Sequence, residues 1–168
     1  MPGCGPAEEA GLTAPANCRY LPVGHERGRE VATRYLRLSD GGALPELEAL
    51  SPYKAVVVIE QNVSAQWQTK VARWLADSGC RYMIAWGTNC GSWHDSVDHA
   101  NLEKFGFAEI PDDDFIMTTW HDDEPLQEVF WFAKITAHHP TLDLANVLFL
   151  HIGSADRQRE FEDLYRNA

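Results

Sequence analysis

Basic residues are scarce in the centre of the sequence. Residues 55–154 contain five lysines and arginines against fourteen acidic residues, so this segment carries −9 of the chain's net charge of −11. Within residues 95–128, eleven acidic residues accompany a single base, Lys104. Such an acidic field repels the phosphates of nucleic acids and the anionic surfaces of membranes. It suits a basic protein partner or a cation, and equally a solvated acidic surface that keeps the protein soluble.

Several common motifs are also absent. No apolar run approaches the ~20 residues of a membrane span. Neither GxGxxG nor GxxxxGK[ST] occurs, which argues against a nucleotide bound at a helix N-terminus. The first residues show no basic region followed by an apolar one, so we expect no secretory signal, a cytoplasmic location and reduced thiols. No CxxC pair of the zinc-ribbon or thioredoxin type is formed by Cys4, Cys18, Cys80 and Cys90.

The length of 168 residues suits one domain with one core. Residues 1–16 are rich in Gly, Pro and Ala, and predict a mobile tail ahead of a single α/β domain over residues 17–168. The start of that domain is ambiguous. The stretches CRYLPV and TRYLRLS could be short strands, and LPELEALSP could be a short helix that ends before Pro52.

Strand and helix patterns alternate regularly from Tyr53 onward. The run KAVVVIE is typical of a buried strand, and Trp67, Val71, Trp74 and Leu75 recur at the spacing of a helix face. Because the predicted strands are apolar on both faces, helices must cover both sides of the sheet. Strands are predicted over residues 54–60, 81–87, 114–120 and 146–153, and helices over 64–79, 92–106, 124–139 and 155–167.

This alternation predicts a three-layer, doubly wound α/β fold of the flavodoxin or Rossmann type with a mostly parallel sheet. Four strands form its core, and an N-terminal strand could be added at one edge. The expected order of the four core strands is 2-1-3-4. At the helix starts, Ser92 with Asp95 forms a capping-box pattern. Ser154 and either Asp122 or Asp123 are candidate caps of the two later helices.

Polar, titratable and aromatic residues follow the carboxyl ends of the predicted strands, where open parallel sheets bind ligands. Aromatic side chains in an acidic field suit docking to a basic protein surface. We therefore expect a binding or interaction domain, with a basic protein or a small ligand as partner and no cofactor. Its cleft is predicted to contain Trp86, Asn89, Trp93, His94, Trp120, Asp122 and Asp123.

A small hydrolase is the alternative function. Cys90 lies between a predicted strand and a helix N-terminus, where a thiolate is stabilised by the helix dipole. His121 or His151 could act as its base, and Glu60 could orient that base. The turn reads GTNCG, which differs from the GxSxG nucleophile elbow, and a buried small residue would fit the same position.

A divalent metal site is a second alternative. His94 and Asp98 are four residues apart on one predicted helix, and His121 with Asp122 follows the third core strand. Nitrogen and oxygen ligands of this kind suit zinc, manganese or iron. The spacing matches no strong ligand motif such as HExxH, and the same residues could form simple i,i+4 pairs on a helix surface.

Two stretches carry a family resemblance: AWGTNCGSWHDSVDHANLEKFGF and DDDFIMTTWHDDEPLQEVFWFAK. With these motifs, residues 53–152 resemble an uncharacterised bacterial family defined by a domain of unknown function. The resemblance implies a bacterial origin. It implies no reaction, cofactor or catalytic residue, so the functional expectations above depend on the residues themselves.

Overall fold

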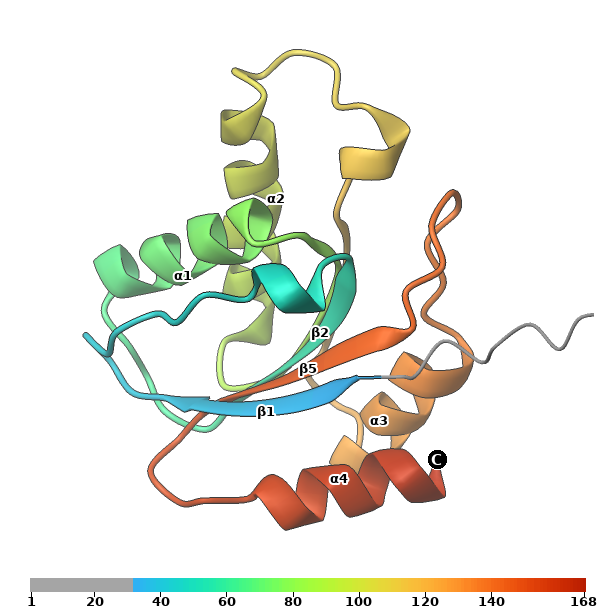
Figure 1. The fold of residues 1–168 in the computed structure, drawn as a ribbon. Coiled ribbons are helices and arrows are strands. Elements are labelled where there is room, and N and C mark those ends of the chain that lie inside the picture. The colour runs from blue at the N-terminus through green and yellow to red at the C-terminus, as the bar shows by residue number, and fades with distance from the viewer. Residues whose placement is uncertain (1–31) are drawn as a thin grey trace, which may run out of the picture.

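The structure is a computed structural model that describes residues 32–168 (Figure 1). The predicted tail over residues 1–16 and the CRYLPV stretch lie outside these residues. The strands are β1 (Thr33–Leu38), β2 (Tyr53–Ile59), β3 (Cys80–Gly87), β4 (Met117–His121) and β5 (Asn146–Ile152). The helices are α1 (Ala65–Asp77), α2 (Cys90–Lys104), α3 (Leu126–Ile135) and α4 (Gln158–Asn167), with short 3₁₀ turns at η1 (Glu48–Leu50) and η2 (Asp112–Asp114).

All five strands are parallel, and their order in the sheet is β1-β5-β2-β3-β4. The predicted α/β fold with a parallel sheet is confirmed, and the N-terminal edge strand is the fifth strand, β1. The predicted order of the core strands was wrong, because β5 pairs with β2 and not with β4. The chain runs outward from β2 through β3 to β4, and α3 then carries it back beneath the sheet to the far side of β2.

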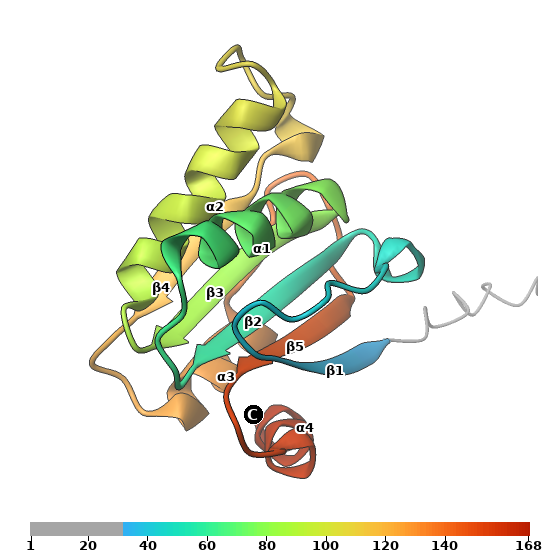
Figure 2. The same cartoon turned by 90° about the vertical axis from the view of Figure 1, so that its left-hand side faces the viewer.

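Helices cover both faces of the sheet. Helices α1 and α2 lie on one face, and α3 and α4 lie on the other (Figures 1 and 2). Alternate strand residues point to opposite faces, as β geometry requires. Val57 and Leu150 therefore belong to the apolar cluster beneath α1 and α2, whereas Val58 and Phe149 belong to the cluster against α3 and α4. Because the centre of the sheet is buried on both sides, β5, β2 and β3 are largely apolar, whereas the edge strands β1 and β4 are more exposed and more polar.

Helix α2 begins two residues earlier than predicted. Asn89 precedes it in the left-handed conformation, with φ 53°, so Cys90 is already helical. The predicted capping box was therefore wrong: Ser92 lies in the first turn, and its hydroxyl donates to the Asn89 carbonyl oxygen at 2.9 Å. The turn before α2 requires glycine at position 87. Its φ is +98°, which other residues rarely adopt, and a Cβ there would lie 2.2 Å from the Ile59 carbonyl oxygen.

The predicted caps of the last two helices were also wrong. Helix α3 starts after Pro125, and neither Asp122 nor Asp123 caps it through a side-chain hydrogen bond. Helix α4 starts at Gln158, whose backbone N–H donates to the Asp156 carboxylate at 2.9 Å and not to Ser154. Helix α3 ends at Ile135, four residues before its predicted end at residue 139. Within residues 32–168, no helix is long and apolar enough to cross a membrane.

Candidate functional site

The carboxyl edge of the sheet carries three separate groups of polar and aromatic side chains. The α2–β4 surface, on the α1–α2 side of the sheet, consists of His94, Asp95, Asp98, Thr118 and Trp120. On the α3–α4 side, the His121 cluster consists of Trp86, Thr119, His121, Glu124 and Phe132. The β2–β5 junction, on the same side, consists of Tyr35, Glu60, His151 and Arg157.

The α2–β4 surface is built from one face of α2 and from β4, which is an edge strand of the sheet. The Trp120 ring is 51% exposed and rests edge-on against His94, with ring centroids 4.6 Å apart. His94 also contacts two carboxylates, with its Nδ1 3.0 Å from Asp95 and its Nε2 3.5 Å from Asp98. The Thr118 hydroxyl donates to Asp98 at 2.6 Å and so ties the helix to the strand.

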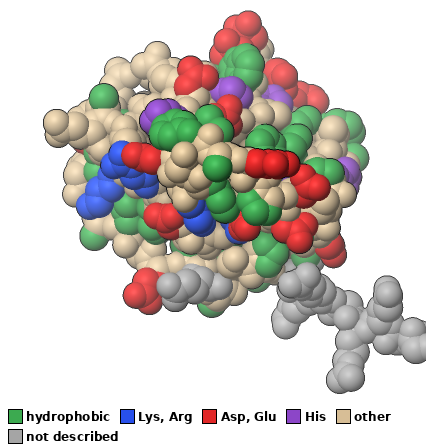
Figure 3. All heavy atoms as spheres, turned by 90° about the horizontal axis from the view of Figure 1, so that it is seen from above, with side chains coloured by type: hydrophobic (Ala, Val, Ile, Leu, Met, Phe, Trp, Pro, Cys, Tyr) green, Lys and Arg blue, Asp and Glu red, His purple; other side chains and the backbone are tan. Residues whose placement is uncertain are grey.

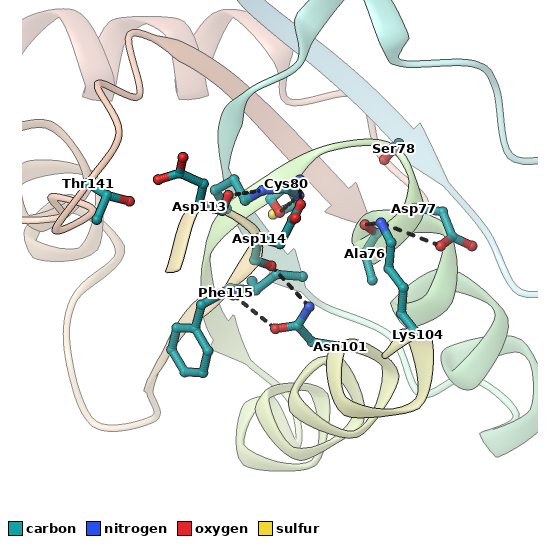
Figure 4. A network of polar contacts seen from close by, with 12 residues as sticks. Ala76, Asp77, Ser78, Cys80, Asn101, Lys104, Asp113, Asp114, Phe115 and Thr141 are labelled. Atoms are coloured by element: carbon teal, nitrogen blue, oxygen red, sulfur yellow. Dashed lines mark hydrogen bonds and ion pairs between the residues drawn. The ribbon is translucent and has the colours of Figure 1, made fainter. Parts of the chain in front are cut away.

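An acid-rich turn, Asp112–Asp114, lies near the C-terminal end of α2 and is fixed against α2 and β3. The Arg81 guanidinium pairs with the Asp114 carboxylate at 2.6 Å and donates to the Asp113 carbonyl oxygen at 2.8 Å. The Asn101 amide bridges the Asp114 carbonyl and the Ile116 N–H (Figure 4). Seen from the α1–α2 side, acidic side chains are interspersed with exposed hydrophobic and histidine side chains (Figure 3).

The His121 cluster is mostly covered. His121 is 7% exposed, and its Nδ1 lies 2.9 Å from a Glu124 carboxylate oxygen while its Nε2 lies 3.2 Å from the Thr119 hydroxyl. Its ring packs on Phe132 of α3 at 4.8 Å between centroids. Trp86 donates its indole N–H to the Glu124 carbonyl oxygen at 2.7 Å. Trp86 and His121 therefore fix the β4–α3 loop.

At the β2–β5 junction, the connections that follow two neighbouring strands leave the sheet toward opposite faces. The chain turns toward α1 after β2 and toward α4 after β5, the arrangement that opens ligand-binding crevices in α/β sheets. His151 is fully buried there, with Nε2 2.8 Å from a Glu60 carboxylate oxygen and Nδ1 2.9 Å from the Tyr35 hydroxyl. Arg157 pairs with both Glu60 and Glu160.

The contact between Arg157 and Glu160 moves the pKa values of both groups. Hydrogen bonding to Glu160 raises the pKa of Arg157, and the same contact lowers the pKa of the Glu160 carboxyl. Burial raises the pKa of the Tyr35 hydroxyl. Arg157 therefore stays charged and holds the loop before α4 against the end of β2. Since His151 has no exposed surface, this junction is a packed polar network in the present conformation.

The structure does not bring Cys90 together with either predicted base. Cys90 is 2% exposed and belongs to the apolar cluster beneath α1 and α2, together with Trp93, which is 1% exposed. His121 and His151 pack on the opposite face, against Phe132 of α3 and Phe161 of α4. The sheet therefore lies between the thiol and both imidazoles, and among residues 32–168 no histidine is hydrogen-bonded to Cys90. Glu60, which the hydrolase alternative offered as a residue that could orient the base, lies against His151.

The predicted metal ligands are divided in the same way. His94 and Asp98 lie together on α2, while His121 faces α3, and Asp122 is exposed in the loop beyond it. In the part of the chain that the structure describes, no group of three or more His, Cys, Asp or Glu side chains is arranged to hold a metal ion.

The predicted cleft residues are also distributed over different environments. Trp93 is a core residue, Trp86 is half-buried, and Asp122 and Asp123 are exposed. Asn89 is exposed and donates its side-chain amide to Asn62 at 3.2 Å. Trp120 and His94 are the aromatic residues of this set that lie together at the surface.

Sequence reasoning missed Tyr35, Thr118 and Arg157 as members of these groups. Tyr35 lies on β1, which pairs with β5 from the other end of the chain, with Tyr35 opposite Phe149. One signal was available: alternation along TRYLRLS places Tyr35 and Arg37 on one face and Leu36 and Leu38 on the other.

Comparison with known proteins gives one match. A family model described as a domain of unknown function (DUF7684) matches residues 33–168, which is most of the chain. The comparisons with curated proteins and with solved structures found no match.

Proposed function

The chain belongs to the DUF7684 family, a domain of unknown function, and on that premise we propose that it is a binding domain. Its binding surface is the α2–β4 surface, and its partner is an extended basic segment of another protein. The observation that carries this proposal is the position of Trp120 on the edge strand β4. Trp120 is half-exposed and rests on His94, which itself contacts the carboxylates of Asp95 and Asp98.

The charge around Trp120 supports a basic partner. Of the eleven acidic residues in 95–128, Glu103 pairs with Arg73 and Asp114 with Arg81. Within residues 32–168, Asp95, Asp98 and Glu109 have no lysine or arginine partner, and neither do the six acids Asp112, Asp113, Asp122, Asp123, Glu124 and Glu128. A lysine or arginine can stack on the Trp120 face through a cation–π contact while its neighbours meet these carboxylates.

The strand carrying Trp120 supports an extended partner. β4 is at the end of the sheet order and pairs only with β3 among the described strands, so its outer backbone groups are available. An extended peptide can add to such an edge through main-chain hydrogen bonds, and alternate side chains then give specificity. Side chains of a peptide paired with β4 that point to the α2 side of the sheet would lie beside Trp120 and Thr118.

The proposal is tested with a short peptide that alternates lysine and threonine, followed by titration monitored through backbone amide NMR signals. We expect saturable shifts in Met117–His121 and in the first half of α2, and an affinity that falls as salt screens the charges. Trp120→Ala should weaken binding by about tenfold or more, as loss of an aromatic anchor does.

Trp131→Ala is the matched control, because Trp131 is 47% exposed but lies on α3, on the other side of the sheet. This control should bind the peptide like the wild type. A peptide that alternates glutamate and threonine should not bind. The proposal fails if Trp120→Ala and Trp131→Ala have equal effects, or if the acidic and basic peptides bind equally.

A further inference from the structure

A hollow of about 640 Å³ lies at the amino edge of the sheet, away from the α2–β4 surface. It is lined by Lys54 from the start of β2, by Lys134 from α3, by Tyr165 from α4 and by the segment 137–145. This volume falls within the range of small-molecule pockets in proteins. The hollow has apolar walls contributed by Leu142 and Leu144.

The charge of this lining differs from that of the molecule as a whole. Two lysines line the hollow, and Asp143 is the one carboxylate among its lining residues. The Lys134 ammonium donates to the carbonyl oxygens of Arg166 and Ala168 at 3.0 and 2.9 Å, which leaves one of its three donors for a ligand. His138 and His139 also line it. His139 uses its Nε2 to contact the Phe115 carbonyl oxygen at 3.0 Å and its Nδ1 to accept from the Thr141 N–H at 3.3 Å, so it is already occupied. In a chain with a net charge of −11, this is a locally positive pocket.

Lys54 is the unusual member of the lining. Its side chain is 5% exposed, and its ammonium donates to the carbonyl oxygens of Ala133 and Ala137 at 2.8 and 3.0 Å. None of the carboxylates whose side chains the structure describes lies in ion-pair contact with it. A buried charge is costly unless an opposite charge compensates it, and an ammonium has three N–H groups to donate. These two carbonyls lie at the negative, C-terminal end of α3 and use two of the three donors of Lys54, so one donor is left without a partner and the charge has no full counter-charge.

Burial lowers the pKa of Lys54, and the Asp143 carboxylate opposes that effect. Asp143 is exposed, so its charge is partly screened by water and compensates the ammonium weakly. An anion that entered the hollow would supply the missing counter-charge from close range. It would also satisfy the remaining Lys54 donor.

From this geometry we infer that the hollow is a binding site for a small organic anion, with the anionic group on Lys54 and Lys134 and the apolar part against Leu142 and Leu144. The anionic group is a compact oxyanion, either a carboxylate or a phosphate. This site is independent of the proposed peptide surface, because the two lie at opposite edges of the sheet.

The test is a titration of the full-length protein with acetate and, separately, with inorganic phosphate, monitored by NMR at constant ionic strength with chloride as the balancing anion. We expect saturable shifts of the backbone amides in residues 137–145 with at least one oxyanion and none with chloride. The oxyanion that binds more tightly identifies the headgroup as carboxylate or phosphate.

Asp143→Asn is the decisive variant, because Lys54 also holds the end of α3 and Lys54→Met could unfold the protein. Removing the Asp143 charge removes repulsion of the anion, so the affinity should rise by roughly threefold or more. Lys134→Met should lower it, while Lys70→Met, which removes an exposed charge on α1, should leave it unchanged. The inference is overturned if neither oxyanion gives saturable shifts, or if Asp143→Asn does not tighten binding.

Discussion

His151 Nε2 and a carboxylate oxygen of Glu60 lie 2.8 Å apart across the junction of β5 and β2. The other ring nitrogen of His151 lies 2.9 Å from the Tyr35 hydroxyl, and that hydroxyl oxygen accepts the backbone N–H of Arg157 at 3.2 Å. For a neutral imidazole beside an ionised Glu60, one arrangement of hydrogens satisfies all of these contacts. The Nε2–H donates to Glu60, and the Tyr35 O–H donates to Nδ1.

The first prediction concerns this tautomer. Since Glu60 is an acceptor and Tyr35 must donate its hydrogen to His151, the ring should carry its hydrogen on Nε2, with Nδ1 as the acceptor. Nitrogen-15 NMR of the histidine rings separates the two nitrogens by their chemical shifts. A hydrogen found on Nδ1, with Nε2 unprotonated, would contradict the proposed network.

The second prediction concerns the Tyr35 hydroxyl itself. Tyr35→Phe leaves the buried His151 Nδ1 without a donor and the Arg157 N–H without an acceptor, so it should lower the free energy of unfolding by about 1–3 kcal/mol. Urea denaturation measures this loss. Tyr165→Phe is the matched control, because the Tyr165 hydroxyl has no hydrogen-bond partner within residues 32–168. Equal losses in the two variants would show that the hydrogen bonds of the Tyr35 hydroxyl make no specific contribution to stability.

The third prediction separates core tryptophans from surface ones. Trp93 is 1% exposed and packs edge-on against Trp67, with ring centroids 6.4 Å apart. Trp93→Ala should therefore lower the free energy of unfolding by about 3–5 kcal/mol through the cavity it leaves. Trp120→Ala should cost much less, because half of that ring already faces water. Chemical denaturation of both variants tests this, and similar losses would contradict the environments described for them.

The helices and strands after Tyr53 could be predicted from the sequence because their signals are local. A run such as KAVVVIE and the helical spacing of Trp67, Val71 and Leu75 depend only on neighbouring residues. The order of the strands could not be predicted in the same way. It depends on which side of the sheet α3 crosses, and that is decided by packing between segments far apart in the chain.

The candidate site was predictable in part for the same reason. The carboxyl edge was correctly expected to concentrate polar and aromatic residues, but the sequence did not assign them to faces. Period-two alternation places His151 in line with Val147 and Phe149, on the α3–α4 face, whereas Cys90 lies under α2 on the other face. Two properties therefore separate the thiol from the histidines. The alternation of side chains along each strand is a short-range property, whereas the face of the sheet that each helix covers is a long-range one.

The fourth prediction concerns the pH dependence of stability. Cys80 is fully buried, and burial raises the pKa of its thiol from 9.0 to about 12. In the unfolded chain the thiol loses its proton near the lower value, whereas in the folded protein it keeps the proton up to the higher one. Between these values the folded state binds more protons than the unfolded state, so the free energy of unfolding must fall as the pH rises.

The expected contribution of Cys80 to this slope is about 1.4 kcal/mol per pH unit for one proton. Cys80→Ala removes the contribution, so the difference in stability between wild type and variant should shrink steadily as the pH rises from 9.0 toward 12. Tyr53, whose pKa is also raised by burial, adds a further slope above 10.0 that Tyr53→Phe removes. Urea denaturation across this range measures both effects. Parallel pH profiles for the wild type and Cys80→Ala would contradict the prediction, because a buried neutral thiol must resist ionisation that the unfolded chain allows.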